Sequence, residues 1–309
     1  MHNYPLRQMK PEDRNEISEL IYLSINVWYQ LHALPPPFRG GPEVTELFYD
    51  VYESLEGSEG IVVKLKRSDR LVGSCFYHIR PTHVSLGIMN VHPNYFGQGI
   101  ARTLLNQIIQ IAENEKKPIR LVSSALNLDS FSLYTRAGFI PRYVYQDMII
   151  DVPSDGLNYN ASGSKMVRDA TMQDISEMSE LEINIVNMNR ASDYRHIIEN
   201  KERIWHMSVF ENKEGKIDGF LVSCTHPAVN MLGPGVARTE DQAVALILKE
   251  LNRYRGRKLL LVVPVEFSKL IKQIYSWGGK NCELHFCQVR GEFKTIGGIT
   301  MPGYMPETC

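Results

Sequence analysis

The chain has 309 residues, of which 43% are hydrophobic and 22% charged, and its formal net charge is −1. This length predicts two domains, and the composition is that of an ordinary globular protein able to bury two cores. Because the net charge is almost zero, the chain has no overall field for nucleic acid or an anionic membrane, and neither is an expected partner.

The first half alternates helical and strand patterns. In chain order, the spacing of apolar residues and the helix-start signals predict strands at 4–9, 60–67, 71–80, 83–91, 118–125 and 142–150, and helices at 12–30, 43–55, 98–115 and 129–137. This order predicts an α/β (α+β) fold in which a mixed, mostly antiparallel, twisted sheet is flanked by helices.

A stretch rich in turn-forming residues, Pro153 to Ser164, separates the two halves. We therefore predict a first domain at 1–155, a linker at 156–163 and a second domain at 164–309. The second half predicts more than one helix within 171–204, single helices at 240–254 and 265–277, and strands at 206–213, 217–225, 228–233, 258–263 and 283–290.

The two halves repeat each other in two places. LRQMKPEDRNEISEL (Leu6–Leu20) aligns without a gap on VRDATMQDISEMSEL (Val167–Leu181), at an offset of 168 − 7 = 161. Tyr134-Thr-Arg-Ala-Gly138 resembles Tyr275-Ser-Trp-Gly-Gly279, at an offset of 275 − 134 = 141. Two echoes in the same order predict two copies of one fold.

The cysteines and the apolar runs restrict the class further. Five cysteines without a CxxC pair predict reduced thiols, and neither a disulfide framework nor a zinc site is expected. The N-terminus MHNYPLRQMK lacks the apolar core of a signal peptide, and the longest apolar run, Leu259–Val265, is too short to cross a bilayer. We expect a cytoplasmic protein that binds neither membrane nor metal.

The segment NVHPNYFGQGIARTLL, Asn90–Leu105, joins a predicted strand to a predicted helix through Gly97 and Gly99. Glycine adopts positive φ easily, and the first amides of a helix have no partner within it. Such a corner can bind a pyrophosphate through the backbone and the helix dipole. The same residues are also consistent with a tight structural turn.

This corner and the segment NLDSFSLYTRAGF that follows it resemble the acetyl-CoA-binding core of the GNAT N-acetyltransferase superfamily, which carries Gln/Arg-x-x-Gly-x-Gly/Ala after a strand ending in Val-x-Pro. Val91-His-Pro93 supplies the strand end, and Phe96-Gly-Gln-Gly99-Ile-Ala101 supplies the turn. Phe96 departs from the pattern because it replaces Gln or Arg. The downstream Asn127 and Tyr134 match the family's spacing.

The resemblance implies a role for each matching position. Backbone groups of Met89, Asn90 and Val91 would pair with the pantetheine arm, as an added strand does. Asn127 would contact the arm, and Tyr134 would protonate the departing thiolate. The pyrophosphate would bind to backbone amides of the turn and the helix start, namely Phe96, Gly97, Gln98, Gly99, Ile100, Ala101 and Arg102.

The general base is not evident. Many relatives carry a Glu on the strand before the turn, but here that strand, HVSLGIMNV, has no carboxylate. His83 and His92 flank it and are candidates, but a structural or exposed position is favoured for each. A water relay, or an acceptor that is already deprotonated, would equally meet the need.

The second half has a different corner, LGPGVARTEDQAVALIL (Leu232–Leu248), in which a Gly-Pro-Gly turn is expected between strand and helix. Pro234 removes a backbone donor, and the acidic residues after Thr239 would compete with a pyrophosphate. This half resembles the divergent C-terminal domains of tandem GNAT proteins of the YitH type. We therefore expect it to have weakened or lost acetyl-CoA binding.

The predicted function is transfer of an acetyl group from acetyl-CoA to a small-molecule amine by direct attack, with Tyr134 as general acid, in a monomer or homodimer. Three alternatives remain open. The chain is a non-catalytic acyl-CoA-binding or sensing protein, or its acceptor is a thiol-cofactor precursor, as in mycothiol synthases, or a protein amine.

Overall fold

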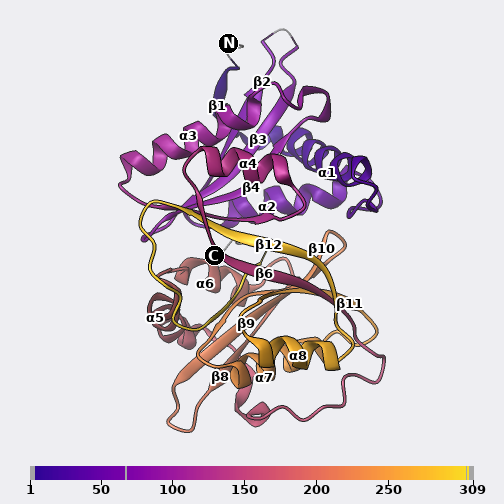
Figure 1. Cartoon of the computed structure of the whole chain (residues 1–309), viewed down its shortest axis with the longest axis vertical. Helices are drawn as coiled ribbons and strands as arrows, with labels where there is room; N and C mark the ends of the chain where they lie inside the picture. Colours follow the sequence, from indigo (N-terminus) through magenta and orange to yellow (C-terminus); the bar gives the residue numbers. More distant parts are fainter. Residues whose placement is uncertain (1–3, 67, 304, 306–309) are drawn as a thin grey trace. The chain divides into compact units, whose positions relative to one another are not determined.

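The computed structural model describes residues 4–66, 68–303 and 305, and it divides into two compact units, Met1–Ile119 and Arg120–Cys309 (Figure 1). Each unit has its own set of neighbouring strands with helices against them. Two domains of this α/β kind, with open and mostly antiparallel sheets, are what the sequence predicts.

The first unit has four antiparallel strands in the order β1-β2-β3-β4. Helix α1 buries Ile17, Leu20, Ile21 and Ser24, which recur at the spacing of one helix face. The elements are β1 (Leu6–Gln8), α1 (Arg14–Leu31), α2 (Glu46–Ser54), β2 (Ser58–Lys64), β3 (Leu71–Ile79), β4 (Val84–Val91) and α3 (Ile100–Asn114), with short 3-10 turns at Pro11–Asp13, Pro42–Thr45 and Pro93–Tyr95.

Strand β3 has helices on both of its faces. A Cβ atom added at Gly73 would lie 2.6 Å from Ile100 of α3, so the helix packs directly over this glycine. Phe76 points to the opposite face, where its ring stacks on Tyr52 of α2 at 4.3 Å between centroids. The first unit is therefore a sheet covered on both sides.

In the second unit the strands follow the order β5-β12-β6-β11-β10-β9-β8-β7, with β13 also paired to β10. Strands β10 and β11 pair in parallel. The elements are β5 (Ile119–Ser124), α4 (Leu128–Arg136), β6 (Ile140–Asp151), β7 (Val167–Asp169), α5 (Ile175–Val186), α6 (Ala191–Glu199), β8 (Trp205–Glu211), β9 (Ile217–His226), β10 (Val229–Ala237), α7 (Glu240–Leu251), β11 (Lys258–Pro264), α8 (Ser268–Ser276), β12 (Lys280–Arg290) and β13 (Ile299–Met301).

Two strands from different halves of the sequence interleave in this unit. Strand β6, from the first half, lies between β12 and β11, and β12, from the second half, lies between β5 and β6. The last strand of the first half, β6, thus pairs with β11 of the second half, and β12 of the second half pairs with β5 of the first half. This exchange explains why the compact units do not divide at the middle of the sequence, and the domain boundaries at 155 and 164 stay a prediction.

Helices also cover both faces of the second unit. A Cβ atom added at Gly219 of β9 would lie 3.0 Å from Leu246 of α7, whereas the next residue, Phe220, packs edge-on against Tyr194 of α6. Because neighbouring strand residues point to opposite faces, α6 and α7 lie on opposite sides of the sheet. An apolar core of this unit lies between the strands and α7 and α8.

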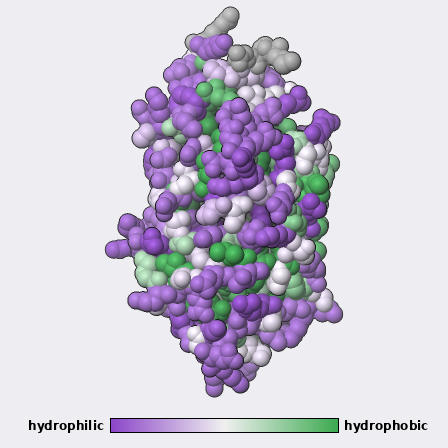
Figure 2. All heavy atoms as spheres, turned by 90° about the vertical axis from the view of Figure 1, so that its left-hand side faces the viewer, coloured by the Kyte–Doolittle hydropathy of each residue, from purple (hydrophilic) through white to green (hydrophobic). Residues whose placement is uncertain are grey.

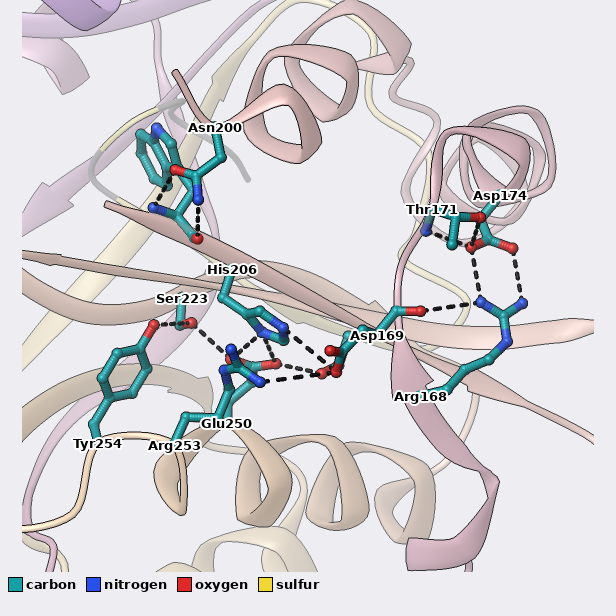
Figure 3. Close-up of polar contacts among 12 residues, drawn as sticks. Arg168, Asp169, Thr171, Asp174, Asn200, His206, Ser223, Glu250, Arg253 and Tyr254 are labelled. Carbon is teal, nitrogen blue, oxygen red and sulfur yellow. Dashed lines mark hydrogen bonds and ion pairs between the residues drawn. The ribbon is translucent and has the colours of Figure 1, made fainter. Parts of the chain in front are cut away.

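The first predicted echo is present as the same set of bonds in both units. Arg7 donates two hydrogen bonds of 2.6 Å to Asp13, and Arg168 donates two of 2.8 Å to Asp174 (Figure 3). Glu16 accepts from the Leu71 amide at 2.7 Å, and its counterpart Glu177 accepts from the Ile217 amide at 2.9 Å. The residues repeated in the two halves are therefore those whose hydrogen bonds connect a strand, a turn and a helix.

The second predicted echo is out of register by one residue. Helices α4 and α8 each have nine residues, and each ends before a glycine at φ +87°, Gly138 and Gly278. The offset is 278 − 138 = 140, not 141. Tyr134 therefore corresponds to Ile274, and the prediction that Tyr275 takes its place in the second half is wrong.

The helices predicted within 171–204 are α5 and α6, which are separated where Asn187 adopts a left-handed φ of +54° directly after α5. One predicted element of the second half differs from the structure. The Gly-Pro-Gly segment is not a turn, since β10 continues through it to Ala237. A Cβ atom at Gly233 would lie 2.3 Å from the Pro302 carbonyl, so this glycine permits close approach of two backbones.

Three cysteines, Cys75, Cys224 and Cys282, have free thiols as predicted, but Cys287 is disulfide-bonded, contrary to that prediction. No helix in the described ranges has both the length and the apolar character needed to cross a membrane. The face drawn in Figure 2 is mainly hydrophilic, with hydrophobic residues in small separate patches, as is usual for a globular domain.

Candidate functional site

The glycine-rich corner in the first unit is an eight-residue loop, His92–Gly99, between β4 and α3. Gly97 and Gly99 have φ values of +74° and +85°, and no atom lies within 4 Å of a Cβ added at either position. The backbone conformation, and not lack of space, is therefore what requires glycine at both positions.

The start of α3 leaves backbone donors available. The first hydrogen bond of the helix runs from the Thr103 amide to the Gly99 carbonyl at 3.0 Å, so the amides of Ile100, Ala101 and Arg102 do not bond within the helix. The first turn of α3 has no acidic residue. An anion at this end would meet N–H groups and the positive end of the helix dipole.

Two side chains of the loop have different surroundings. Phe96 is 40% exposed, and so an apolar ring faces solvent where the GNAT pattern has Gln or Arg. Gln98 accepts a 3.0 Å hydrogen bond from the Tyr4 hydroxyl and donates to the Asn94 carbonyl at 3.2 Å. Gln98 thus holds the loop together, while Phe96 leaves its surface uncharged.

Strand β4 carries an irregularity just before the segment expected to pair with pantetheine. Tyr77 faces Leu86 and Cys75 faces Met89, so β4 has two residues, Gly87 and Ile88, where β3 has one. Such a bulge interrupts regular pairing and changes the direction of backbone groups. The Asn90 side chain is buried and donates to Ser24 of α1 at 2.6 Å, so this hydrogen bond holds it against the helix.

The two histidines that flank β4 are buried. His83 has no exposed surface, and its Nδ1 lies 3.0 Å from the Thr82 hydroxyl. His92 accepts a 3.2 Å hydrogen bond from the Asn94 amide, and burial lowers the pKa of its imidazole. These contacts favour structural roles for both residues.

In the second unit, Asn127 caps the N-terminus of α4. Its side-chain oxygen accepts from the Ser130 amide at 3.0 Å. The residues on either side, Leu126 and Leu128, are exposed, at 44% and 69%. A half-buried amide between two exposed leucines can still contact a ligand that carries both apolar and amide groups, as a pantetheine arm does.

Tyr134 lies on the second turn of α4 and is 6% exposed. Its ring packs on Phe139 at 5.7 Å between centroids, and its backbone carbonyl accepts from the Phe139 amide at 3.1 Å. The left-handed Gly138 makes this reversal of the chain possible. The tyrosine is thus rigidly held.

The equivalent places in the second half have lost these features. Only Arg238 and Thr239 join β10 to α7, where the first unit has eight residues between β4 and α3. Phe267 replaces Asn127 as the cap of the last helix, and Ile274, which is fully buried, replaces Tyr134. The second copy therefore lacks the loop, the amide cap and the tyrosine hydroxyl that the first copy has at these positions.

Groups of the same chain also contact the first residues of α7. Glu240 accepts a 2.6 Å hydrogen bond from the Leu270 amide, and Asp241 forms a 2.5 Å ion pair with Lys269. Strand β13 pairs with Gly235–Ala237 of β10, the counterpart of the end of β4. Acidic side chains and a strand of the same chain thus occupy the region that a cofactor would need.

One polar cluster is not evident from the sequence. Asp147 of β6 and Glu283 and His285 of β12 each place one ligand-capable atom within 4.8 Å of the others. Asp147 and Glu283 are 283 − 147 = 136 residues apart in the chain. The only local signal is the Glu-x-His spacing, which is too common to be informative without the strand pairing.

Comparison with known families agrees with this architecture. Residues 25–139 match the sequence model of the acetyltransferase (GNAT) family, and residues 178–284 match that of an acetyltransferase (GNAT) domain. The chain belongs to the GNAT acetyltransferases and has two tandem GNAT domains. UPF0157 protein YqkA of Bacillus subtilis is 32% identical over 102 residues, a match that spans 33% of this chain and only 28% of that protein.

Solved structures show the same fold over nearly the whole chain. A Pyrococcus horikoshii protein assigned as an acetyltransferase has a TM-score of 0.74 at 16% identity, covering 97% of this chain and 94% of that one. A GCN5-related N-acetyltransferase of Sphaerobacter thermophilus has a TM-score of 0.64 at 17% identity, covering 96% of this chain and 98% of that one. A tandem GNAT protein from the clavulanic acid biosynthesis pathway has a TM-score of 0.64 at 14% identity, covering 94% of this chain and 100% of that one.

Proposed function

We propose that this chain is an N-acetyltransferase that moves the acetyl group of acetyl-CoA to a small-molecule amine in the cytoplasm, using one cofactor site. The observation that carries the proposal is the asymmetry between the two copies. The first copy retains the glycine loop, Asn127 and Tyr134, and the second has lost all three. Loss in one copy only is expected if the retained set has a function.

In the proposed reaction the backbone of Met89–Val91 pairs with the pantetheine arm, and the amides of Gly97 and of Gly99 to Arg102 bind the pyrophosphate. The amides of Phe96 and Gln98, which the sequence also assigns to the pyrophosphate, instead donate to the Pro93 and Tyr95 carbonyls. Asn127 contacts the arm while it caps α4. The amine nitrogen forms a bond to the thioester carbon, the carbon–sulfur bond breaks, and the Tyr134 hydroxyl gives its proton to the leaving thiolate. The attacking amine nitrogen gives up one proton, which passes to water.

The test compares two tyrosines on equivalent helices. Tyr134→Phe removes the proposed acid, whereas Tyr275→Phe removes the hydroxyl of the exposed tyrosine on α8 as a matched control. Release of free CoA thiol is measured with acetyl-CoA and a panel of primary amines. We expect Tyr134→Phe to lower kcat by about a hundredfold or more and Tyr275→Phe to leave it unchanged.

Different outcomes separate the alternatives. Unchanged turnover in Tyr134→Phe would remove the acid role. Acetyl-CoA binding without transfer to any amine, thiol precursor or protein amine would support an acyl-CoA sensor in place of an enzyme.

A further inference from the structure

Three side chains that can bind a metal ion, Asp147 of β6 and Glu283 and His285 of β12, lie on one face of the sheet in the second unit. In the pairing of the two strands, Glu283 is directly opposite Asp147, and His285 is opposite Tyr145. Residues opposite each other, and residues two apart on a strand, share a face. The three side chains therefore converge, with one ligand-capable atom of each within 4.8 Å of the other two.

A bulge in β12 determines which side chain faces Asp147. In the register of the two strands, Glu283 follows Asn281 directly as a partner of β6, so Cys282 is an extra residue. A regular strand would place the cysteine, and not the glutamate, opposite Asp147. The Cys282 thiol instead donates to the backbone carbonyl of Asp147 at 3.4 Å. Bulges often redirect a side chain in this way next to functional sites.

The cluster lies on the face of β12 that is turned away from α4. Phe286, the neighbour of His285, points to the other face, where its ring packs on Phe131 of α4 at 5.3 Å between centroids. The cluster is therefore separate from Tyr134 on that helix, and its function does not follow from the proposed reaction.

The two carboxylates of the cluster face each other with little positive charge beside them. Asp147 is only 2% exposed, and like charges directly opposite each other on neighbouring strands are destabilising. Within the described ranges, Asp147 forms an ion pair with the imidazole of His285 and with no lysine or arginine. Buried charges are paired or coordinate metal ions, so a cation that contacts both carboxylates would stabilise this arrangement.

The distances suit a small ion with nitrogen and oxygen ligands. Nδ1 of His285 lies 2.8 Å from Oδ1 of Asp147, and their side chains are 13% and 3% exposed. Two atoms bonded at about 2.0 Å to a tetrahedral zinc ion are roughly 3.3 Å apart, so a small opening of this pair lets an ion replace the hydrogen between them. Zinc accepts imidazole and carboxylate ligands together, whereas Mg²⁺ and Ca²⁺ prefer oxygen ligands.

Neighbouring groups hold Glu283 in place. The Ser124 hydroxyl of β5 donates a short hydrogen bond to its carboxylate, and the Ala125 amide donates to the Leu284 carbonyl at 2.8 Å. A carboxylate has several lone pairs, so it can accept this bond and bind an ion at the same time, as ligating carboxylates commonly do. Three adjacent strands thus position the ligands.

We propose that Asp147, Glu283 and His285 bind one Zn²⁺ ion, with water as the fourth ligand. Each carboxylate contributes an oxygen, and the neutral imidazole contributes a ring nitrogen. The ion links β6, from the first half of the sequence, to β12, from the second half. It therefore stabilises the exchange of strands between the halves, and this role does not depend on acetyl transfer.

A histidine with two carboxylates elsewhere in the same unit gives a matched control (Figure 3). His206 places Nδ1 2.9 Å from Glu250 and Nε2 3.4 Å from Asp169. An ion bound to either nitrogen would therefore reach one carboxylate only. In the part of the chain that the structure describes, these three residues do not bring their ligand atoms within 4.8 Å of one another, as the cluster around His285 does.

The experiment is calorimetric titration of the whole chain with Zn²⁺, after treatment with EDTA and dialysis. We expect one site per chain. Loss of a group that only supports a ligand costs about 10- to 100-fold in affinity, so loss of a ligand in Asp147→Asn, Glu283→Gln or His285→Gln should cost at least about a hundredfold. His206→Gln should bind Zn²⁺ as the unmodified chain does, and Mg²⁺ and Ca²⁺ should bind far more weakly.

Two further measurements identify the ligands. X-ray absorption at the zinc edge should show nitrogen and oxygen at about 2.0–2.1 Å and no sulfur at about 2.3 Å. Zn²⁺ should raise the melting temperature of the unmodified chain and of His206→Gln, but not that of Glu283→Gln. Glu283 is partly exposed, so this variant keeps the fold even if Asp147→Asn does not.

Three results would overturn the proposal. The first is no Zn²⁺ binding by the unmodified chain, which would make the cluster a histidine–carboxylate pair only. The second is binding that persists in Glu283→Gln and His285→Gln or falls equally in His206→Gln. The third is a zinc–sulfur distance in the absorption spectrum that disappears in Cys282→Ser. None of these results bears on acetyl transfer, which is measured separately.

Discussion

Tyr134 on α4 and Ile274 on α8 occupy equivalent positions in the two copies of the fold. Both lie seven residues into helices of nine residues, both are buried, and both are followed four residues later by a glycine at φ +87°. One copy thus has a hydroxyl where the other has an aliphatic side chain. The copies share a scaffold, and only the first has the hydroxyl to which we assign the role of general acid.

The glycine loop provides the first prediction. Gly99→Ala places a Cβ on a residue with φ +85°, which costs about 1–2 kcal/mol of stability. Gly278→Ala at φ +87° is the matched control, since open space surrounds both positions. We expect a similar fall in melting temperature for both variants, but weaker acetyl-CoA binding in calorimetry for Gly99→Ala alone. Equal affinities in the two variants would argue against a phosphate role for the loop.

Phe96 provides the second prediction. Because its ring is 40% exposed, an Arg fits at this position without disturbing the core. A new hydrogen bond to a charged group adds about 1.5–3 kcal/mol, so Phe96→Arg should tighten acetyl-CoA binding roughly ten- to a hundredfold. The gain should shrink as salt is added, and it should be absent for CoA analogues that lack the pyrophosphate. A variant with unchanged affinity would mean that this side chain does not face the phosphates.

The Arg168–Asp174 pair makes stability depend on pH. Burial opposes ionisation of Asp174, but hydrogen bonds from Arg168 and the Thr171 amide outweigh it and hold its pKa below the ordinary 3.8. A lowered folded pKa stabilises the fold above pH 3.8, and that stability is lost as pH falls through the folded value.

Asp174→Asn should therefore lower the free energy of unfolding by about 1–2 kcal/mol at pH 7 and flatten its decline below about pH 3.8, as measured by urea titration. Asp241→Asn, which breaks the exposed pair with Lys269, is the control and should leave stability unchanged. If both substitutions lower the free energy of unfolding equally, the buried hydrogen bonds of Asp174 contribute no more to stability than a surface ion pair.

Local patterns in the sequence are sufficient to predict the elements and the duplication. The bonds of Arg7 with Asp13 and of Arg168 with Asp174 lie within six residues, so the letters that form them repeat visibly. The family motif likewise lies in one continuous segment, and its glycines do adopt the left-handed backbone that the pattern predicts.

Features that depend on distant strands are not predictable in this way. Two adjacent glycines, Gly278 and Gly279, follow α8, and only the backbone shows that the first has positive φ and corresponds to Gly138. The sequence predicts a turn at Gly233, which is wrong, because the sequence gives no sign of the close approach of Gly233 to the Pro302 carbonyl. The Asp147–His285 pair depends on an exchange of strands between the halves, which no local pattern encodes.

The most direct test of the central claim is calorimetric titration of the whole chain with acetyl-CoA. We predict one site per chain, weakened in Gly99→Ala and unaffected in Gly278→Ala. Two sites per chain would contradict the asymmetry between the copies, and no binding would contradict the proposed function itself.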